Sequence, residues 1–387
     1  MHVNRDFLIS TATQTTGLTD FGERGWSEGL DRLLDALDTE AQLTDLGRMI
    51  AVQEIGAFLA NRLRIVDWRS RNPETATREI KAPLVIAGLS RTGTTILHDL
   101  LAQDRELHRA PLTWEVSRPV PPAAAEAYDN DPRIGTVQAE IDMGNQVMPD
   151  LMKFHPVGAR LAQGCVRITA SDFRSTSFPA QYRVPGYTRW LLNEADLASA
   201  YRWHRAFLQH LQTDEPPRRW LLKAPAHTWH LPALLAEYPD AVVIQLHRDP
   251  LRVMASVSGL VTYPRGAVSE GRTPAETAAE YAEPLLDAFA RSEQARDNGL
   301  LPPDQVIDVR YRDLVADPLR TIRGIYDRLG TPLSASAAQA MREFLVVRPA
   351  DTSPRYSFAR TGLDANALRE RLRGYQERFG VADEPLT

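Results

Sequence analysis

The 387-residue sequence contains very little cysteine and no long apolar run. The single cysteine, Cys165, excludes an intrachain disulfide and a metal site built on cysteine ligands. The first residues, MHVNRDFLIS, lack the apolar core of a signal peptide, and no window approaches the roughly eighteen apolar residues of a membrane-spanning helix. We therefore expect a soluble, cytoplasmic protein without a transmembrane segment.

Neither sign of charge dominates the chain. The 45 basic and 50 acidic residues give a formal net charge of −5, so the overall charge does not favour nucleic acid as a partner. The 43% hydrophobic and 25% charged residues are ordinary for a folded globular protein and exclude a disordered chain. Only three basic residues are lysines: Lys81, Lys153 and Lys223. A lysine beside a candidate pocket is therefore of interest, because lysine and arginine are not interchangeable there.

The apolar pattern predicts strands that alternate with helices. Four short segments are predicted strands, at 83–87, 220–222, 241–246 and 305–309, and the first is a wholly apolar run typical of a buried parallel strand. We predict an α/β protein with a P-loop-like three-layer fold, a central parallel sheet with helices on both faces, and helical N-terminal and cap segments. The expected parts are an N-terminal helical segment at 1–80, an α/β domain at 81–349 with a helical insert at about 131–212, and a C-terminal loop and helix at 350–387.

The segment 88–95, GLSRTGTT, follows the first predicted strand and precedes a helix. Its glycine spacing matches the P-loop, in which backbone N–H groups and a helix N-terminus hold phosphate. Thr94 stands where the P-loop requires lysine, so the contact with the outer phosphates of a nucleoside triphosphate is missing. The segment thus favours phosphate binding without the chemistry of an ATPase or kinase. A glycine turn that merely joins strand to helix is the alternative.

A second candidate phosphate site follows the third predicted strand. Arg248 leaves this strand in the sequence Arg-Asp-Pro, and Ser256 lies eight residues further on, in the expected helix. An arginine pairs a phosphate through two hydrogen bonds, and a serine hydroxyl adds a further donor. The alternative is a surface arginine at an ordinary Asp-Pro helix start.

Together the two motifs resemble those of the sulfotransferases that use 3′-phosphoadenylyl sulfate (PAPS). The first is similar to the arginine form of their 5′-phosphosulfate loop, found in tyrosylprotein and some bacterial enzymes, and the second to their 3′-phosphate site. The resemblance spans about residues 84–329. It implies PAPS as co-substrate, 3′-phosphoadenosine 5′-phosphate (PAP) as product, and no metal. The residues that it places on the 5′-phosphosulfate are Arg91, Thr92, Gly93, Thr94 and Thr95, and those on the 3′-phosphate are Arg248 and Ser256.

Two further segments extend the resemblance toward the C-terminus. Residues 309–315, VRYRDLV, are similar to a segment of the family whose tyrosine lies near the nucleotide, and this tyrosine is here Tyr311. Arg312 departs from the acidic residue that is usual in that segment. Arg355 and Tyr356 are assigned to a C-terminal loop that closes over the nucleotide.

Sulfuryl transfer, treated by analogy with phosphoryl transfer, needs fixed positive charge around the transferring group. Arg91 and Lys223 are the predicted cations. Lys223 ends the second predicted strand, in the sequence Lys-Ala-Pro, and related sulfotransferases carry a lysine at the end of a comparable strand. A surface lysine whose stem alone is buried is the alternative for this position.

A base must also take the proton of the acceptor hydroxyl. Glu115 is the predicted base, because the similar tyrosylprotein enzymes place a catalytic glutamate in a comparable loop after the first helix. His227 is the second candidate, since an unperturbed imidazole titrates close to neutral pH. His98 and His247 are expected to be structural.

The sequence therefore predicts a bacterial PAPS-dependent sulfotransferase that acts in line, without metal, on a hydroxyl of a small-molecule acceptor. The aromatic residues of the 131–212 insert are suited to capping a hydrophobic acceptor, although most of them are expected in the core. The identity of the acceptor and the oligomeric state stay open. The alternatives are a P-loop nucleotide kinase that binds ATP with Mg²⁺, and a protein that binds PAP without turnover.

Overall fold

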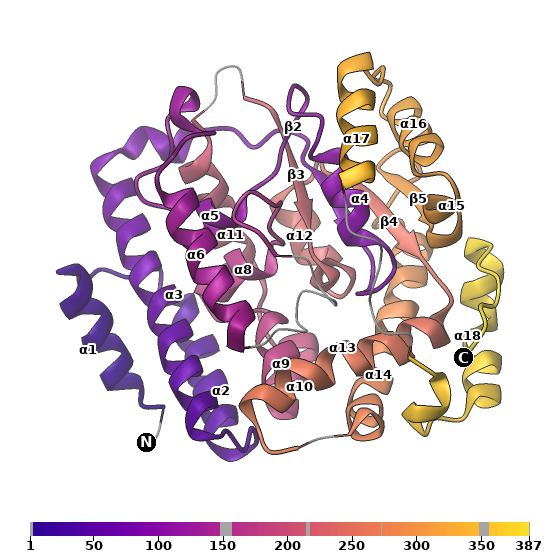
Figure 1. The fold of residues 1–387 in the computed structure, drawn as a ribbon, viewed down its shortest axis with the longest axis horizontal. Coiled ribbons are helices and arrows are strands. Elements are labelled where there is room, and N and C mark those ends of the chain that lie inside the picture. Colours follow the sequence, from indigo (N-terminus) through magenta and orange to yellow (C-terminus); the bar gives the residue numbers. More distant parts are fainter. Residues whose placement is uncertain (1–2, 148–156, 214–216, 272, 348–355, 387) are drawn as a thin grey trace. The chain divides into compact units, whose positions relative to one another are not determined.

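The computed structural model describes residues 3–147, 157–213, 217–271, 273–347 and 356–386 (Figure 1). The chain packs into two compact units, each assembled from segments that are distant in the sequence. Unit 1 comprises Met1–Ile80, Pro111–Pro217 and Val261–Arg272, and unit 2 comprises Lys81–Ala110, Arg218–Leu260 and Thr273–Thr387. The domain boundaries expected from the sequence stay a prediction. Along the described stretches, none of the helices combines the length and apolar character needed to cross a membrane.

Unit 2 contains a five-stranded sheet in which every pair of neighbours is parallel. In spatial order its strands are β2 (His108–Arg109), β3 (Arg219–Lys223), β1 (Leu84–Ala87), β4 (Val242–His247) and β5 (Val306–Arg310). The predicted α/β class with a central parallel sheet is confirmed, and the four predicted strands are correct to within one residue at each end. The strand β2 was not predicted, because its two residues are polar and carry no apolar signal.

Buried apolar residues explain why the centre of this sheet forms. The residues of β1 are completely buried, and they pair with β3 on one side and β4 on the other. Such a continuous apolar run is typical of a parallel strand covered on both faces. Because all five strands are parallel, their carboxyl ends meet at one edge of the sheet. In open α/β sheets, ligands bind at this edge.

Helices connect the strands of unit 2. The α-helices are α4 (Thr94–Leu101), α12 (Leu231–Glu237), α13 (Pro250–Val268, in unit 2 as far as Leu260), α14 (Pro274–Asp297), α15 (Tyr311–Ala316), α16 (Pro318–Arg328), α17 (Ala335–Val347) and α18 (Ala365–Phe379). Two short 3₁₀ helices are η4 (Pro225–Thr228) and η5 (Phe358–Thr361). The helix α14 begins with a capping box, in which Thr273 and Glu276 each accept a hydrogen bond from the other's backbone N–H.

Unit 1 is helical over its described residues, as the sequence predicts for the N-terminal and cap segments. Its N-terminal part contains α1 (Arg5–Thr16), α2 (Gly25–Thr39), α3 (Asp45–Arg71) and η1 (Pro73–Thr77). Its middle part contains α5 (Thr113–Ser117), η2 (Ala125–Ala127), α6 (Arg133–Val147), α8 (Val166–Thr169), η3 (Ala170–Asp172), α9 (Ser177–Gln181), α10 (Pro185–Asn193) and α11 (Ala198–Leu211).

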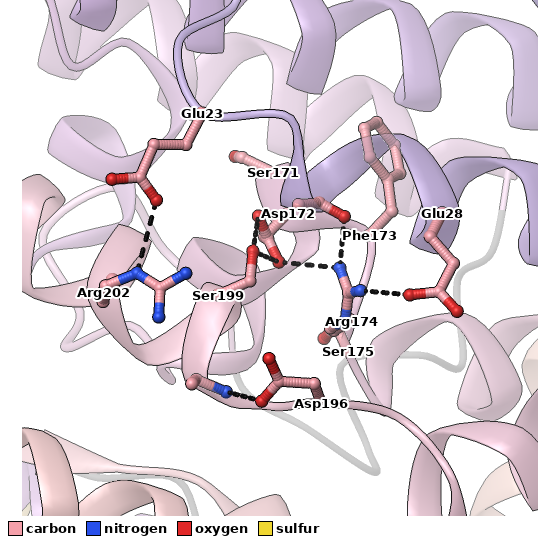
Figure 2. A network of polar contacts seen from close by, with 12 residues as sticks. Glu23, Glu28, Ser171, Asp172, Phe173, Arg174, Ser175, Asp196, Ser199 and Arg202 are labelled. Carbon is pink, nitrogen blue, oxygen red and sulfur yellow. Dashed lines mark hydrogen bonds and ion pairs between the residues drawn. The ribbon is translucent and has the colours of Figure 1, made fainter.

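A buried polar network joins these two parts of unit 1 (Figure 2). Its centre is Asp172, which is completely buried at the end of η3. The carboxylate accepts hydrogen bonds from Ser199 at 3.1 Å, from Arg174 at 3.2 Å and from Arg62 at 3.4 Å. Arg174 also pairs with Glu28 of α2 at 2.7 Å. Burial lowers the pKa of Arg62 to about 10, so this guanidinium stays charged at neutral pH and needs the carboxylate as its partner.

We expect Asp172→Asn to lower the free energy of unfolding by about 3 kcal/mol, because it removes the carboxylate that pairs with buried Arg62 and leaves Arg174 with Glu28 alone. Denaturant titration measures this loss. The matched control is Glu140→Gln, which removes a carboxylate from the exposed pair with Arg118. Exposed pairs contribute less than about 1 kcal/mol. Equal effects of the two substitutions would show that the network does not stabilise unit 1.

Buried histidines make stability depend on pH. Burial lowers the pKa values of His98, His204 and His230 to about 3, and those of His108 and His210 to about 4. The unfolded chain takes up protons at these positions near the ordinary imidazole pKa, about 6.5, whereas the folded chain does not. The free energy of unfolding should therefore fall as the pH drops from about 6.5 to 5, by up to about 1.4 kcal/mol per pH unit for each histidine.

Denaturant titrations at several pH values between 7.5 and 5 test this prediction. Replacing His204 with Gln should make the free energy of unfolding depend less steeply on pH, by the contribution of one proton. The reason is that burial lowers the pKa of His204 and keeps it neutral in the folded state. A free energy of unfolding that stays constant over this range would contradict the prediction.

Candidate functional site

The loop between β1 and α4 adopts a conformation that requires two of its glycines. Gly88 has φ of +149° and Gly93 has φ of +94°. A Cβ atom at Gly93 would lie 3.1 Å from side-chain atoms of Leu314 and Tyr311, so these neighbours leave little room there. Arg91, with φ of +74°, is in the left-handed region that residues with a side chain rarely adopt. Such a conformation persists only where its surroundings hold it.

The loop presents backbone donors at the start of α4. Thr94 is the first residue of the helix and Thr95 the second, so their N–H groups have no acceptor within it. These N–H groups and the positive end of the helix dipole favour an anion at this position. Thr92 is buried, and its hydroxyl donates to the carbonyl oxygen of Leu89 at 2.7 Å. This hydrogen bond holds the shape of the loop.

The structure brings the two sequence motifs into direct contact. The Arg91 Nε donates to Ser256 Oγ, in α13, at 2.9 Å. The Arg248 Nη1, just beyond β4, donates to the carbonyl oxygen of Arg91 at 2.7 Å. Residues separated by more than 150 positions in the sequence therefore form one polar cluster within unit 2.

Arg248 is held on several sides. Its guanidinium lies over the ring of Tyr311, 3.9 Å from the ring centroid, and it pairs with the Glu384 carboxylate at 2.9 Å. Its side chain is 11% exposed. Burial by itself lowers the pKa of Arg248, but the hydrogen bond with Glu384 and nearby negative charge outweigh this effect and raise it. Arg248 is therefore a fixed, fully charged cation at the ligand edge of the sheet.

Lys223 lies at the same edge. It is the last residue of β3, pairs in register with Ile86 of β1, and is 5% exposed. Burial and the charge of Lys223 together lower the pKa of His98 to about 3, so His98 is a neutral imidazole. His227 lies in η4, four residues after Lys223, and is also buried.

His247 is the last residue of β4 and belongs to a packed polar cluster. Its ring nitrogens make hydrogen bonds with the Tyr375 hydroxyl at 2.8 Å and with Asp308 at 2.9 Å. Its ring stacks on Phe379, with the centroids 4.0 Å apart. Burial lowers its pKa although Asp308 opposes this effect. These contacts fix β4 against α18.

Glu115 lies in unit 1, in the short helix α5 and not in a loop as expected. It is 2% exposed. Its Oε2 accepts hydrogen bonds from the backbone N–H of Leu112 and from the Tyr128 hydroxyl, both at 3.0 Å. The adjacent Trp114 is completely buried. The carboxylate is thus held in a defined orientation.

The C-terminal assignments have different outcomes. Arg355 lies outside the described residues. Tyr356 packs against α13 so closely that a Cβ atom at Gly259 would lie 1.9 Å from its ring. Burial raises the pKa of Tyr356, and the charge of Arg91 opposes this effect. The sequence does not point to Glu384, because this residue belongs to no local motif and lies 136 positions from its partner Arg248.

Within the described ranges, no group of three or more His, Cys, Asp or Glu side chains has the arrangement of a metal site. Arg91, Lys223 and Arg248 lie at the ligand edge of the sheet with the backbone N–H groups at the start of α4, an arrangement suited to an anionic ligand.

Comparison with solved structures finds the same architecture in two mycobacterial proteins. The sulfotransferase STF1 of Mycobacterium tuberculosis is 33% identical, with a TM-score of 0.85 over 96% of this chain and 98% of that protein. The sulfotransferase STF9 of Mycobacterium avium is 28% identical, with a TM-score of 0.88 over 98% of this chain and 97% of that one.

Sequence comparison leads to the same family. The omega-hydroxy-beta-dihydromenaquinone-9 sulfotransferase Stf3 of Mycobacterium bovis is 28% identical over 253 residues, which are 64% of this chain and 62% of that relative's length. Residues 83–335 match the sulfotransferase family, and this match includes both candidate phosphate motifs and the whole sheet. The chain therefore belongs to the sulfotransferase family and is a sulfotransferase, as its two motifs predict.

Proposed function

We propose that this sulfotransferase uses PAPS as its donor and transfers the sulfuryl group to a hydroxyl of a small-molecule acceptor. The contact of Arg91 with both Ser256 and Arg248 carries the proposal. PAPS has anionic groups at both its 5′ and 3′ positions, and these three residues join a 5′-phosphosulfate loop to a 3′-phosphate site. A nucleotide kinase has no need for the second of these sites.

The residues of unit 2 fit this donor by charge and by donor type. The loop N–H groups of Thr94 and Thr95 and the guanidinium of Arg91 would hold the 5′-phosphosulfate. Arg248 and Ser256 would hold the 3′-phosphate, and Tyr311 would orient Arg248 through the ring on which it lies. Arg355 is proposed with them from the sequence alone.

PAPS supplies an activated sulfuryl group: the acceptor oxygen bonds to sulfur as the bond from sulfur to the bridging phosphate oxygen breaks, and PAP departs with that electron pair. Arg91 and Lys223 would stabilise the negative charge that gathers on this oxygen. Lys223 suits the role because it is fixed at the end of a central strand and largely buried, where a charge acts more strongly than in water.

The acceptor's proton needs a base, and we propose Glu115, with His227 as the second candidate. Two hydrogen bonds fix the Glu115 carboxylate in one orientation, which favours proton transfer along a defined line. His227 is favoured by its position in η4, directly after the strand that ends in Lys223. Glu115 belongs to unit 1 and His227 to unit 2. Substituting each residue by itself shows which of the two takes the proton.

The acceptor is proposed to be a hydroxyl-bearing, hydrophobic small molecule. The mycobacterial relative Stf3 is named for a hydroxylated dihydromenaquinone. We propose the same class of acceptor, and no particular molecule, for this protein. Several aromatic residues of the insert belong to the core of unit 1, as the sequence predicts for most of them. Phe173, Phe178, Tyr187 and Trp190 are buried and pack ring against ring in unit 1, so they form its core.

We expect Arg248→Ala to weaken PAP binding about thirtyfold, equivalent to about 2 kcal/mol, because it removes the charged partner of the 3′-phosphate. Adenosine 5′-phosphate, which is PAP without the 3′-phosphate, should lose much less affinity, through the lost hydrogen bond to the Arg91 backbone oxygen alone. Calorimetric titration measures both ligands. Arg310→Ala is the matched control, since Arg310 pairs with Asp313 at 2.7 Å and its side chain is 46% exposed.

Equal losses for PAP and adenosine 5′-phosphate in Arg248→Ala would remove Arg248 from the 3′-phosphate site. Binding of ATP with Mg²⁺ by the unmodified protein, and no binding of PAP, would support the kinase alternative. Tight PAP binding together with no transfer to any hydroxylated acceptor would support the alternative of a PAP-binding protein without turnover.

We expect Glu115→Gln to leave PAP affinity unchanged and to lower turnover by about a hundredfold or more. The amide keeps the shape of the side chain and an oxygen that accepts the Leu112 N–H, but it cannot take a proton. Turnover is followed with sulfur-labelled PAPS and hydroxylated quinols as acceptors. Full turnover in Glu115→Gln combined with a large loss in His227→Gln would move the base to His227.

A further inference from the structure

The C-terminal segment places a carboxylate on the arginine proposed for the 3′-phosphate. The Arg248 Nε donates to Glu384 Oε1 at 2.9 Å, and Nη2 donates to Glu384 Oε2 at 2.9 Å. The two parallel hydrogen bonds use one edge of the guanidinium. The Nη1 is already bonded to the carbonyl oxygen of Arg91. Glu384 thus occupies the paired donors with which an arginine ordinarily binds a phosphate.

A second carboxylate fixes the segment that carries Glu384. Asp249, which follows Arg248, is completely buried and accepts the backbone N–H of Glu384 at 2.6 Å. The same carboxylate receives two hydrogen bonds from Arg369 of α18, at 2.6 and 2.7 Å. Arg369 in turn pairs with Asp383 at 2.9 Å. The position of Glu384 is therefore set by a buried anchor beside the site, and the segment lies against α18 (Figure 1).

The next residues connect this segment to the other C-terminal part of unit 2. The backbone N–H of Phe358, at the start of η5, donates to the carbonyl oxygen of Leu386 at 2.9 Å. Two positions before Phe358, the ring of Tyr356 packs against Gly259 of α13, and the backbone oxygen of Tyr356 accepts a hydrogen bond from Arg252. The Glu384 contact is thus part of an ordered C-terminal structure around α13.

We propose that Glu384 is an internal competitor for the 3′-phosphate and that PAP or PAPS must displace its carboxylate from Arg248 to bind. The inference rests on the proposed function, since it assumes that Arg248 takes the 3′-phosphate. A carboxylate and a phosphate are both anionic, and they compete for the same pair of N–H groups. With both in place, two anions would share one cation in a largely buried site, which like-charge repulsion disfavours.

Competition of this kind lowers the affinity for every ligand that carries a 3′-phosphate. The apparent dissociation constant rises in inverse proportion to the fraction of molecules in which Arg248 is free of Glu384. Ligands without a 3′-phosphate do not need this edge of Arg248, so their affinity is unaffected. Glu384 therefore sets how tightly the product PAP is held relative to nucleotides that lack its 3′-phosphate.

The test is calorimetric titration of the full chain with PAP and with adenosine 5′-phosphate. We expect Glu384→Gln to bind PAP about tenfold more tightly, because a neutral amide competes weakly for a guanidinium, and to bind adenosine 5′-phosphate as before. Asp383→Asn is the matched control. It removes one negative charge from the adjacent position, where the carboxylate contacts Arg369 and Gln376, so PAP affinity should change less than about twofold.

A double-mutant cycle shows whether the effect passes through Arg248. In the Arg248→Ala background, Glu384→Gln should leave PAP affinity unchanged. Unchanged or weaker PAP binding in Glu384→Gln would overturn the proposal, and weaker binding would make Glu384 a residue that orients Arg248. Glu384→Ala is the second variant, and unchanged adenosine 5′-phosphate binding shows that either variant is folded.

Failure of the proposed function gives a different result from failure of this inference. If the unmodified protein does not bind PAP, or if Arg248→Ala binds it normally, the PAPS proposal fails and the competition proposal fails with it. If Arg248→Ala weakens PAP while Glu384→Gln has no effect, the donor site stands and the competition alone is refuted.

Discussion

The hydrogen bond from Arg248 to the backbone oxygen of Arg91 connects the two halves of the proposed donor site. It joins the loop that follows β1 to the turn that follows β4, the neighbouring strand in the sheet. The parallel arrangement makes this contact available, because it brings both strand ends to one edge. Two hydrogen bonds hold Arg91 in its left-handed conformation. Its backbone oxygen accepts from Arg248, and its side chain donates to Ser256.

Two different solutions to buried charge appear in the two units. In unit 1, Asp172 lies between Arg62 and Arg174 and holds them in a closed network. Closed networks of this kind fix structure, because each charge already has its partners. In unit 2, the cations Arg91, Lys223 and Arg248 gather where strands end, beside backbone N–H groups suited to an anion. The first arrangement supports the fold, and the second is suited to the anionic donor that we propose.

Local patterns were sufficient to predict the fold class and the residues that cluster around Arg91. The strands were recognisable because they are short and mainly apolar, wholly so in β1, and the loop because its glycines have fixed spacing. The sequence patterns do not reveal β2, whose paired residues are polar, and Glu115, expected in a loop, lies in the short helix α5. These errors have one cause: such short elements are fixed by tertiary hydrogen bonds more than by periodicity.

The sequence patterns do not predict which distant segments are in contact. Glu384 follows α18 as one of two adjacent acidic residues, and nothing nearby distinguishes it from Asp383. Only the folded chain shows that Asp249 positions Glu384 against Arg248 while Asp383 faces Arg369.

The pairing of Arg248 with Glu384 has a physical reason beyond competition for a ligand. A guanidinium that is only 11% exposed loses much of its hydration, and a buried cation without an anion is costly. The ligand supplies that anion only when it is bound, so a carboxylate from the chain can balance Arg248 at other times. Because the nucleotide must break the Glu384 pairing, the stabilisation that Glu384 gives to the ligand-free protein makes the binding free energy of the nucleotide less favourable by the same amount. A stronger pairing of Arg248 with Glu384 would stabilise the ligand-free protein and weaken donor binding. The C-terminal segment is in this way coupled to the donor binding that we propose at the sheet edge.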